Sequence, residues 1–456
     1  MPSMGADGEE GRAGEGEGEG ASSLAVVLNI VKAVVGAGSF SLPYGVASFG
    51  WLASLIGTFV LAALCAGTIE IVSKVGDLHV DQRAKVTAPA STRDGAAPRS
   101  SLGASSSTVA SVRPAPQGNG RLESYVALCW TALSEAGYPR SARWISVALY
   151  GAIVLTSIGA CAAYLVFCAQ MLLQVGAFPS VPPEKASHYL VWAMCGPLIL
   201  LTWLPSFSYL AYTSIVGDIA LATGLIVTVA YGVALHPGAA QDPIPLFIPS
   251  GFGRFFGVTA FLFAVHMLCT PLEASMARPA RFRPLVRRTF TFLSIINAAF
   301  GTGCAILFGP TVNPLVISSM TSSFAHLPTV VRIALFFDLI FTYSIVLVPG
   351  RDLLERALHL RSPSLPRYLA RAILVLITGF IAVTVRDFSD LVGLVSGLSL
   401  SYAAFIVPSF LYLLVLWPRN GSHPLGAAAA LGVMGLGVVS AYMSTSTAIV
   451  SIVKNW

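Results

Sequence analysis

The chain has 456 residues, of which 55% are hydrophobic and 11% charged, and its formal net charge is +6 at pH 7. A soluble domain carries about 25% charged residues, so this composition excludes a conventional soluble enzyme and favours a protein with many membrane spans. The basic excess does not indicate a nucleic-acid partner, because the Lys and Arg residues are scattered over short segments between apolar runs.

The N-terminal segment is acidic and poor in bulky side chains. Residues 1–23 include EEGRAGEGEGEGASS, which cannot bury enough apolar surface to offset the entropy of ordering. We therefore expect a disordered acidic tail over residues 1–23 and a transmembrane domain over residues 24–456. The tail is not a signal peptide, because the apolar run after it is long enough to span and many more spans follow.

Apolar runs long enough to cross a bilayer recur along the rest of the chain. A transmembrane helix needs about 20 such residues in succession, and counting the runs predicts an all-α polytopic membrane protein with about 11 transmembrane helices and the lipid bilayer as a partner. The predicted helices are residues 24–48, 51–74, 143–175, 188–204, 212–235, 254–276, 289–309, 329–349, 368–385, 389–417 and 424–452.

One long connection interrupts this pattern. Residues 76–121 are mostly Ala, Ser, Thr, Gly, Pro and Arg, which predicts a flexible cytoplasmic loop. After it, Tyr125, Cys129 and Leu133 recur at helical spacing, which predicts a short helix on the membrane surface.

The distribution of basic residues predicts the orientation. With the N-terminus in the cytoplasm, the cytoplasmic segments hold 21 of the 27 Lys and Arg residues. The positive-inside rule then favours a cytoplasmic N-terminus and an extracellular or lumenal C-terminus. The pattern does not distinguish the plasma membrane from a vacuolar or lysosomal type of membrane.

The first predicted span contains an unusual centre. In NIVKAVVGAGSFSLPYGVASFGW, the residues Gly36, Ala37, Gly38 and Ser39 stand where a span ordinarily has Leu and Ile, and Pro43 follows them. An unwound helix at membrane depth exposes backbone groups, which is tolerated where they line a cavity or bind a ligand. The alternative is close packing of small residues against a neighbouring helix.

The sixth predicted span combines ionisable groups with a helix breaker. In FFGVTAFLFAVHMLCTPLEASMARP, His266, Pro271 and Glu273 lie within eight residues of each other. Charged side chains at mid-bilayer usually face the interior of the bundle, because each costs roughly 2.5–3.5 kcal/mol on insertion scales. The first and sixth spans are five spans apart, so they occupy corresponding positions in two inverted five-helix repeats followed by one extra helix. Interrupted helices at such positions indicate a binding site at the breaks.

Further polar side chains fall inside predicted spans. Lys32 lies on the cytoplasmic side of the first break, where it is expected to extend to the interface or to pair with a carboxylate. Glu70 and Asp218 lie near the cytoplasmic ends of their spans, where solvated interfacial groups are expected. In the third span, Tyr164 is a candidate for the lining of a transport pathway.

Candidates for ion coupling are carboxylates and hydroxyls at membrane depth. Asp338 lies deep in the eighth span, and Thr342 and Ser344 follow it as possible oxygen ligands. A carboxylate at such a position is suited to taking up and releasing a proton. Together with Glu273 and His266, Asp338 is therefore a coupling candidate.

Enzyme and metal sites are not indicated. The pair Gly36 and Gly38 is too short for a dinucleotide motif, and the sequence has no phosphate-binding loop and no converging catalytic groups. The seven cysteines include no CxxC pair, so we expect neither a disulfide framework nor a metal cluster. No cofactor is expected beyond a coupling ion, H⁺ or Na⁺.

Several segments resemble the amino acid/auxin permease family. NIVKAVVGAGSFSLPYGVASFGW resembles its first helix, SYLAYTSIVGDIAL the entry to its fifth, FAVHMLCTPLEASM its sixth, VPGRDLLE the step after its eighth and FSDLVGLVSGLSLSYAAFIVPSFLYL its tenth. The resemblance is closest to the vesicular, vacuolar and proton-coupled branches, and it covers nearly all of residues 24–417. The chain departs from the family in the eighth helix, where Thr342-Tyr343-Ser344-Ile345-Val346 lacks the family's Pro and Gln.

The resemblance implies a five-plus-five inverted-repeat transporter of amino acids with broken helices 1 and 6. Substrate-binding candidates are then Gly36, Ala37, Gly38, Ser39, Tyr164, Phe263 and His266, of which Phe263 and His266 match a Phe and a His common in the sixth helix of vesicular and vacuolar members. We expect proton-coupled amino acid transport. The alternatives are a Na⁺-coupled or uncoupled permease, or a sensor of the same fold that binds amino acids without transporting them.

Overall fold

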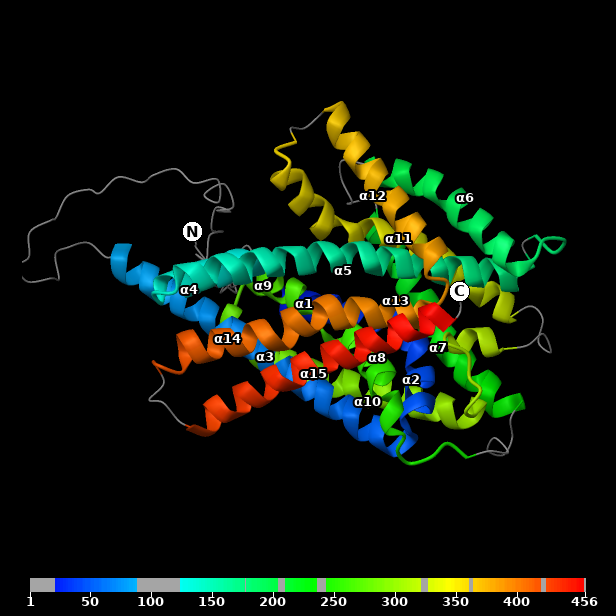
Figure 1. Ribbon diagram of the computed structural model, residues 1–456, viewed down its shortest axis with the longest axis horizontal. Helices are drawn as coiled ribbons and strands as arrows, with labels where there is room; N and C mark the ends of the chain where they lie inside the picture. Colours follow the sequence, from blue (N-terminus) through cyan, green and yellow to red (C-terminus); the bar gives the residue numbers. More distant parts are fainter. Residues whose placement is uncertain are drawn as a thin grey trace, which may run out of the picture.

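The computed structural model describes residues 21–87, 124–176, 178–203, 210–235, 243–320, 327–360, 364–419 and 424–454. Over these ranges the protein is all-helical, and one isolated β-bridge joins Ala21 to Met276. Figure 1 shows the long helices packed as one bundle around α5.

The helices follow the predicted apolar runs. Their bounds are α1 (Ser23–Val34), η1 (Ala37–Ser41), α2 (Leu42–Phe49), α3 (Trp51–Thr87), α4 (Tyr125–Glu135), α5 (Pro139–Gln174), α6 (Pro183–Trp203), α7 (Leu210–Leu235), η4 (Pro249–Gly251), α8 (Phe252–Phe263), α9 (His266–Ser275), η5 (Pro279–Arg281), α10 (Phe282–Phe308), η6 (Val316–Ser319), α11 (Leu327–Ala357), α12 (Leu365–Thr384), α13 (Phe388–Val395), η8 (Ser396–Leu400), η9 (Tyr402–Ile406), α14 (Val407–Leu411), η10 (Tyr412–Leu416) and α15 (Pro424–Lys454).

Eleven of the described helical segments are long and apolar enough to cross a membrane, which confirms the predicted number. In the third span, α5, and in the sixth, 72% of the most apolar window is buried, against 17% in α15. The third and sixth spans therefore lie at the centre of the bundle and α15 lies at its edge. The inverted-repeat relation between the two halves stays a prediction.

The predicted cytoplasmic loop begins later than expected. Helix α3 continues through Thr87, so residues 76–87 are helical, and the remainder of the predicted loop lies outside the described residues. The predicted acidic tail also lies almost wholly outside them.

The predicted short helix exists as α4, but its apolar side chains pack against the protein. Tyr125, Cys129 and Leu133 are buried in a cluster with residues of α3, α5 and α14. Burial raises the pKa of the Tyr125 phenol well above its ordinary value, and its hydroxyl donates to the carbonyl of Ala403 at 3.0 Å. Helix α4 is thus attached to the tenth span and packs against α3 and α5.

The tenth span departs from regular helix. Three π-helical segments, η8, η9 and η10, widen it between α13 and the end at Leu416. Asp387 caps its N-terminal end and accepts the amides of Ser389 and Asp390 at 2.7 and 3.3 Å. Ser396 within the first π-helical segment donates to the carbonyl of Gly257 in α8 at 2.6 Å, which holds the tenth span against the sixth.

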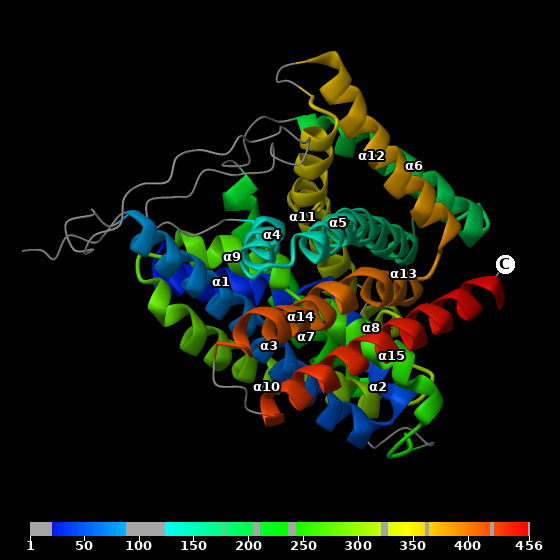
Figure 2. The same ribbon diagram turned by 60° about the vertical axis from the view of Figure 1, so that its left-hand side comes forward.

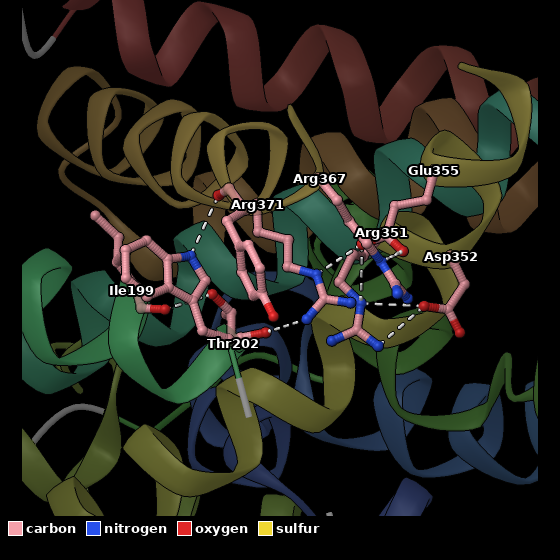
Figure 3. A network of polar contacts seen from close by, with 9 residues as sticks. Ile199, Thr202, Arg351, Asp352, Glu355, Arg367 and Arg371 are labelled. Atoms are coloured by element: carbon pink, nitrogen blue, oxygen red, sulfur yellow. Dashed lines mark hydrogen bonds and ion pairs between the residues drawn. The ribbon is translucent and has the colours of Figure 1, made fainter. Parts of the chain in front are cut away.

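A buried charged network joins α6, α11 and α12 (Figure 3). The Glu355 carboxylate accepts the Nε atoms of Arg367 at 2.6 Å and Arg371 at 2.7 Å. Arg371 also donates to the carbonyl of Thr202 at the end of α6 at 2.8 Å. The side chains of Glu355 and Arg371 are only 8% and 6% exposed, so the network fixes three helix ends against each other.

Candidate functional site

The first span is broken in its middle. Helix α1 ends at Val34, the backbone of Gly36 is extended (φ −142°, ψ −162°), and η1 leads directly into α2, where Pro43 occupies the first turn. Pro is well placed there because the first-turn amides have no partner within the helix. The prediction of an interruption at Gly36 to Ser39 agrees with this geometry.

The break leaves backbone donors free. The amide of Ser39 donates to the carbonyl of Gly36 at 3.0 Å, and the amide of Val35 to that of Val31 at 2.7 Å. The amides of Gly36, Ala37 and Gly38 have no acceptor among the described residues. Three successive unpaired donors at membrane depth are costly unless a ligand or water accepts them.

The sixth span is broken at Ala264 and Val265, between α8 and α9. This break lies several residues before Pro271, which stands inside α9 and was the expected interruption. It also places His266 at the first position of α9.

The two breaks lie against each other. A Cβ atom added to Gly38 would lie 3.1 Å from side-chain atoms of both Phe261 and Leu262, at the end of α8. Glycine at this position therefore permits the close approach of η1 to α8. A Cβ atom added to Gly36 would meet nothing within 4 Å, so open space adjoins this break.

His266 is 1% exposed, and its contacts define its tautomer. Its Nε2 lies 2.8 Å from the hydroxyl of Thr68 in α3, which in turn lies 2.9 Å from the carbonyl of Leu64. Because the hydroxyl has one proton and the carbonyl can only accept, Thr68 donates to Leu64 and accepts from His266 Nε2–H. Nδ1 is then an acceptor, and it is buried without a partner among the described residues.

Glu273 lies two helical turns after His266 and also faces α3. Its carboxylate accepts the hydroxyl of Ser73 at 2.6 Å, and the residue is 5% exposed. Thr68 and Ser73 thus hold the two ionisable side chains of α9, and neither hydroxyl was singled out from the sequence.

Ser39 and Phe263 are buried on the side of α10. Ser39 donates to the side-chain oxygen of Asn297 at 3.1 Å, and Asn297 donates to the carbonyl of Leu293 at 3.0 Å. The ring of Phe263 packs at 6.0 Å from that of Phe290. A lone amide in an otherwise apolar seventh span was the signal that could have identified Asn297.

Aromatic rings border the first break. Phe40 packs edge-on against Phe167 of α5 at 5.9 Å and against Phe300 of α10 at 6.3 Å. Phe167 continues to Phe388 of α13 at 5.7 Å. Tyr164, one turn before Phe167, is partly buried against the same core, and its role in lining a pathway stays a prediction.

The coupling candidates of the eighth span do not form one group. Thr342 donates to the Asp338 carboxylate at 3.4 Å, and that carboxylate occupies the space beside Gly217 of α7. Ser344 lies two residues beyond Thr342 and therefore on another face of the helix. Its hydroxyl is buried without a partner among the described residues.

Lys32 and Asp218 form an ion pair between α1 and α7 at 3.5 Å, with side chains 27% and 50% exposed. Asp218 adjoins Gly217, so the pair lies beside Asp338. Glu70 pairs with Arg287 of α10 through two hydrogen bonds of 3.0 and 2.9 Å. Lys32 is therefore paired, which was one of its two expected states, and Glu70 and Asp218 are paired where solvated interfacial groups were expected.

The described residues thus contain eleven candidate membrane spans, and the breaks of the first and sixth lie against each other. Residues 19–87 and 106–450 match the family model described as transmembrane amino acid transporter protein, and the chain belongs to this family. The resemblance noted from the sequence is thereby confirmed.

Named relatives align at low identity. The chain is 22% identical over 460 residues to amino acid transporter AVT3B of Arabidopsis thaliana, covering 97% of this chain and 98% of that one. It is 24% identical over 351 residues to the proton-coupled amino acid transporter-like protein pathetic of Drosophila melanogaster, covering 72% of each. It is 24% identical over 279 residues to vacuolar amino acid transporter 3 of Saccharomyces cerevisiae, covering 58% of this chain and 40% of that one.

Proposed function

We propose that this protein is a secondary active transporter of amino acids, with substrate bound between the two helix breaks and protons as the coupling ion. The observation on which the proposal rests is the set of unpaired amides at Gly36, Ala37 and Gly38, beside the break of the sixth span. Membership in the transmembrane amino acid transporter family supports amino acids as the substrate class.

The substrate carboxylate binds the three amides. They lie at the N-cap and start of η1, which leads into α2, and the aligned peptide dipoles of these helices favour negative charge at this end. The open space beside Gly36 gives the carboxylate room, whereas the contact of Gly38 with α8 limits the site on the other side.

The substrate ammonium binds acceptors freed by the same breaks. The last carbonyls of α1 have no partner within that helix, and Nδ1 of His266 is a buried acceptor at the start of α9. His266 therefore accepts a hydrogen bond from the ammonium, while Thr68 holds the opposite side of the ring. Tyr164 and Phe263 contribute to the walls of the site.

Asp338 carries the coupling proton. Lys32 and Asp218 neutralise each other, and Asp338 is a further carboxylate beside this pair with a hydrogen bond from Thr342. An ionised carboxylate at membrane depth costs roughly 2.5–3.5 kcal/mol on insertion scales, and protonation removes this charge. The Drosophila melanogaster relative, named proton-coupled amino acid transporter-like protein pathetic, supports protons over Na⁺ as the coupling ion.

The N-terminus faces the cytoplasm and the C-terminus the outside or a lumen. The positive-inside excess supports this orientation, and the relative named as vacuolar is compatible with an organelle as the location. Thiol labelling tests the orientation, because all seven natural cysteines are buried and do not compete with an introduced one. A cysteine replacing the exposed Ala280 should react only from the cytoplasmic side.

Uptake into proteoliposomes tests the function. Purified protein is reconstituted, a mixture of labelled amino acids is added, and uptake is compared with an inward proton gradient, with an inward Na⁺ gradient and with neither. The proposal expects uptake that the proton gradient increases. Uptake driven only by Na⁺, or equal without gradients, would favour the alternative permeases, and binding without uptake would favour a sensor.

A further inference from the structure

A basic corner of the protein has no carboxylate partner. It comprises the exposed residues Arg278, Arg281 and Arg288, at η5 and the start of α10. Within the described ranges none of the three forms an ion pair. Two neighbours differ, since Arg283 pairs with Asp77 at 2.7 Å and Arg287 with Glu70 at 2.8 Å.

The start of α1 is fastened to the same corner. The amide of Ala21 donates to the carbonyl of Ser275 at 2.8 Å, and the amide of Ala277 donates to the carbonyl of Ala21 at 3.2 Å. Figures 1 and 2 both show α1 and α9 side by side at this end of the bundle. The bridge therefore holds Ala21 against Ala277, the residue before Arg278.

The chain that precedes Ala21 has the opposite charge. Residues 1–20 contain one Arg and six acidic residues, Asp7, Glu9, Glu10, Glu15, Glu17 and Glu19. An extended chain spans at most about 3.3–3.6 Å per residue, so Glu15, Glu17 and Glu19 lie within about 20 Å of the bridge. All three are within reach of the corner.

We propose that the acidic segment of residues 7–19 binds the basic corner formed by Arg278, Arg281 and Arg288. Each exposed ion pair is weak by itself. The bridge at Ala21 tethers the segment beside its partner, however, and short tethers give effective concentrations on the order of millimolar. This binding adds charge contacts at the point where two backbone hydrogen bonds already join the inner halves of both broken helices.

The competing occupant is an anionic lipid headgroup, which a cytoplasmic basic cluster also attracts. The tethered segment is favoured because its acidic residues are covalently held beside the corner and outnumber the free Arg side chains there. The test must distinguish the two.

Distance measurement between two spin labels provides the test. Labels are attached to Ala13→Cys in the segment and Ala280→Cys at the corner, in full-length protein in nanodiscs of zwitterionic lipid. The natural cysteines are buried and do not take up label. The proposal expects a short-distance population that is lost when the five Glu residues are changed to Gln, or when Arg278, Arg281 and Arg288 are changed to Gln.

Three controls sharpen the result. Changing the exposed Arg140 and Arg143 to Gln removes positive charge from another predicted cytoplasmic segment and should leave the distances unchanged. Raising the ionic strength from about 0.15 to 1 M shortens the screening length from about 8 to 3 Å, which should abolish the short population. Exchanging the charges, with Lys in the segment and Glu at the corner, should restore it.

Two results would overturn the proposal. One is a distance distribution that is the same in the parent and in either neutralised variant. The other is loss of the short population when phosphatidylserine is added to the nanodiscs, which would make the corner a lipid-binding site.

Discussion

Replacing Glu355 by Gln tests the buried network at the ends of α6, α11 and α12. Gln has nearly the same shape but no charge, so Arg371, whose side chain is 6% exposed, loses its anionic partner. Removing one partner of a buried ion pair costs about 3–5 kcal/mol, because the remaining charge stays buried. The folded population should therefore fall by roughly a hundredfold or more relative to the unfolded one.

The assay is thermal unfolding in detergent, combined with the half-life of the monodisperse protein at a fixed temperature, because membrane proteins often unfold irreversibly. The matched control is Asp352→Asn, since Asp352 is 38% exposed and pairs only with Arg351, at 2.9 Å, among the described residues. Arg351 is buried, with its side chain 8% exposed, but it keeps Glu355 at 3.9 Å as a second carboxylate when Asp352 is neutralised, so this variant should lose less stability than Glu355→Gln.

A double variant separates loss of charge pairing from loss of packing. Changing both Glu355 and Arg371 to Met removes the buried charges together, and this kind of replacement is often neutral. It should lose less stability than Glu355→Gln alone. The reasoning is refuted if Glu355→Gln is as stable as Asp352→Asn, or if the double variant is the least stable of all.

Three further predictions concern the site and its supports. Thr68→Val leaves the buried His266 Nε2–H without an acceptor, which should cost about 1–3 kcal/mol of stability and weaken substrate binding in uptake assays. The control is Thr58→Val, which removes only a hydrogen bond within α3 and should not weaken binding. Gly253→Ala brings a methyl group to 2.6 Å from the hydroxyl oxygen of Thr447 in α15 and should destabilise the protein by about 1–3 kcal/mol in thermal unfolding. The control is Gly432→Ala, whose methyl group enters open space, and it should be neutral or slightly stabilising. Asp338→Asn should abolish the stimulation of uptake by a proton gradient, with Asp352→Asn as the control; unchanged stimulation would assign the proton to another group.

The sequence was sufficient for the helices and for the position of the first break. Spans follow from apolar runs, because bilayer thickness fixes their length, and the break of the first span follows from Gly36, Gly38 and Pro43. The break of the sixth span lies at Ala264 and Val265 and not at Pro271, which stands inside α9.

Contacts between distant segments could not be predicted in the same way. Thr68 lies 198 positions from His266, and Asn297 lies 258 positions from Ser39. Which residues meet depends on how each helix is rotated about its axis. The sequence does not determine this rotation when a helix is apolar on all sides. For the same reason Arg367 and Arg371 counted from the sequence only toward the basic excess that predicts orientation, and their buried partner Glu355 was not singled out.

The most direct test of the binding site compares Gly36→Leu with Gly67→Leu in the uptake assay. Both glycines have open space around their Cα atoms, but Gly36 lies at the first break and Gly67 on the exposed face of α3. If substrate binds between the breaks, Gly36→Leu should abolish uptake while the correctly inserted Gly67→Leu variant transports like the parent. Equal uptake by the parent and Gly36→Leu would contradict the proposed site.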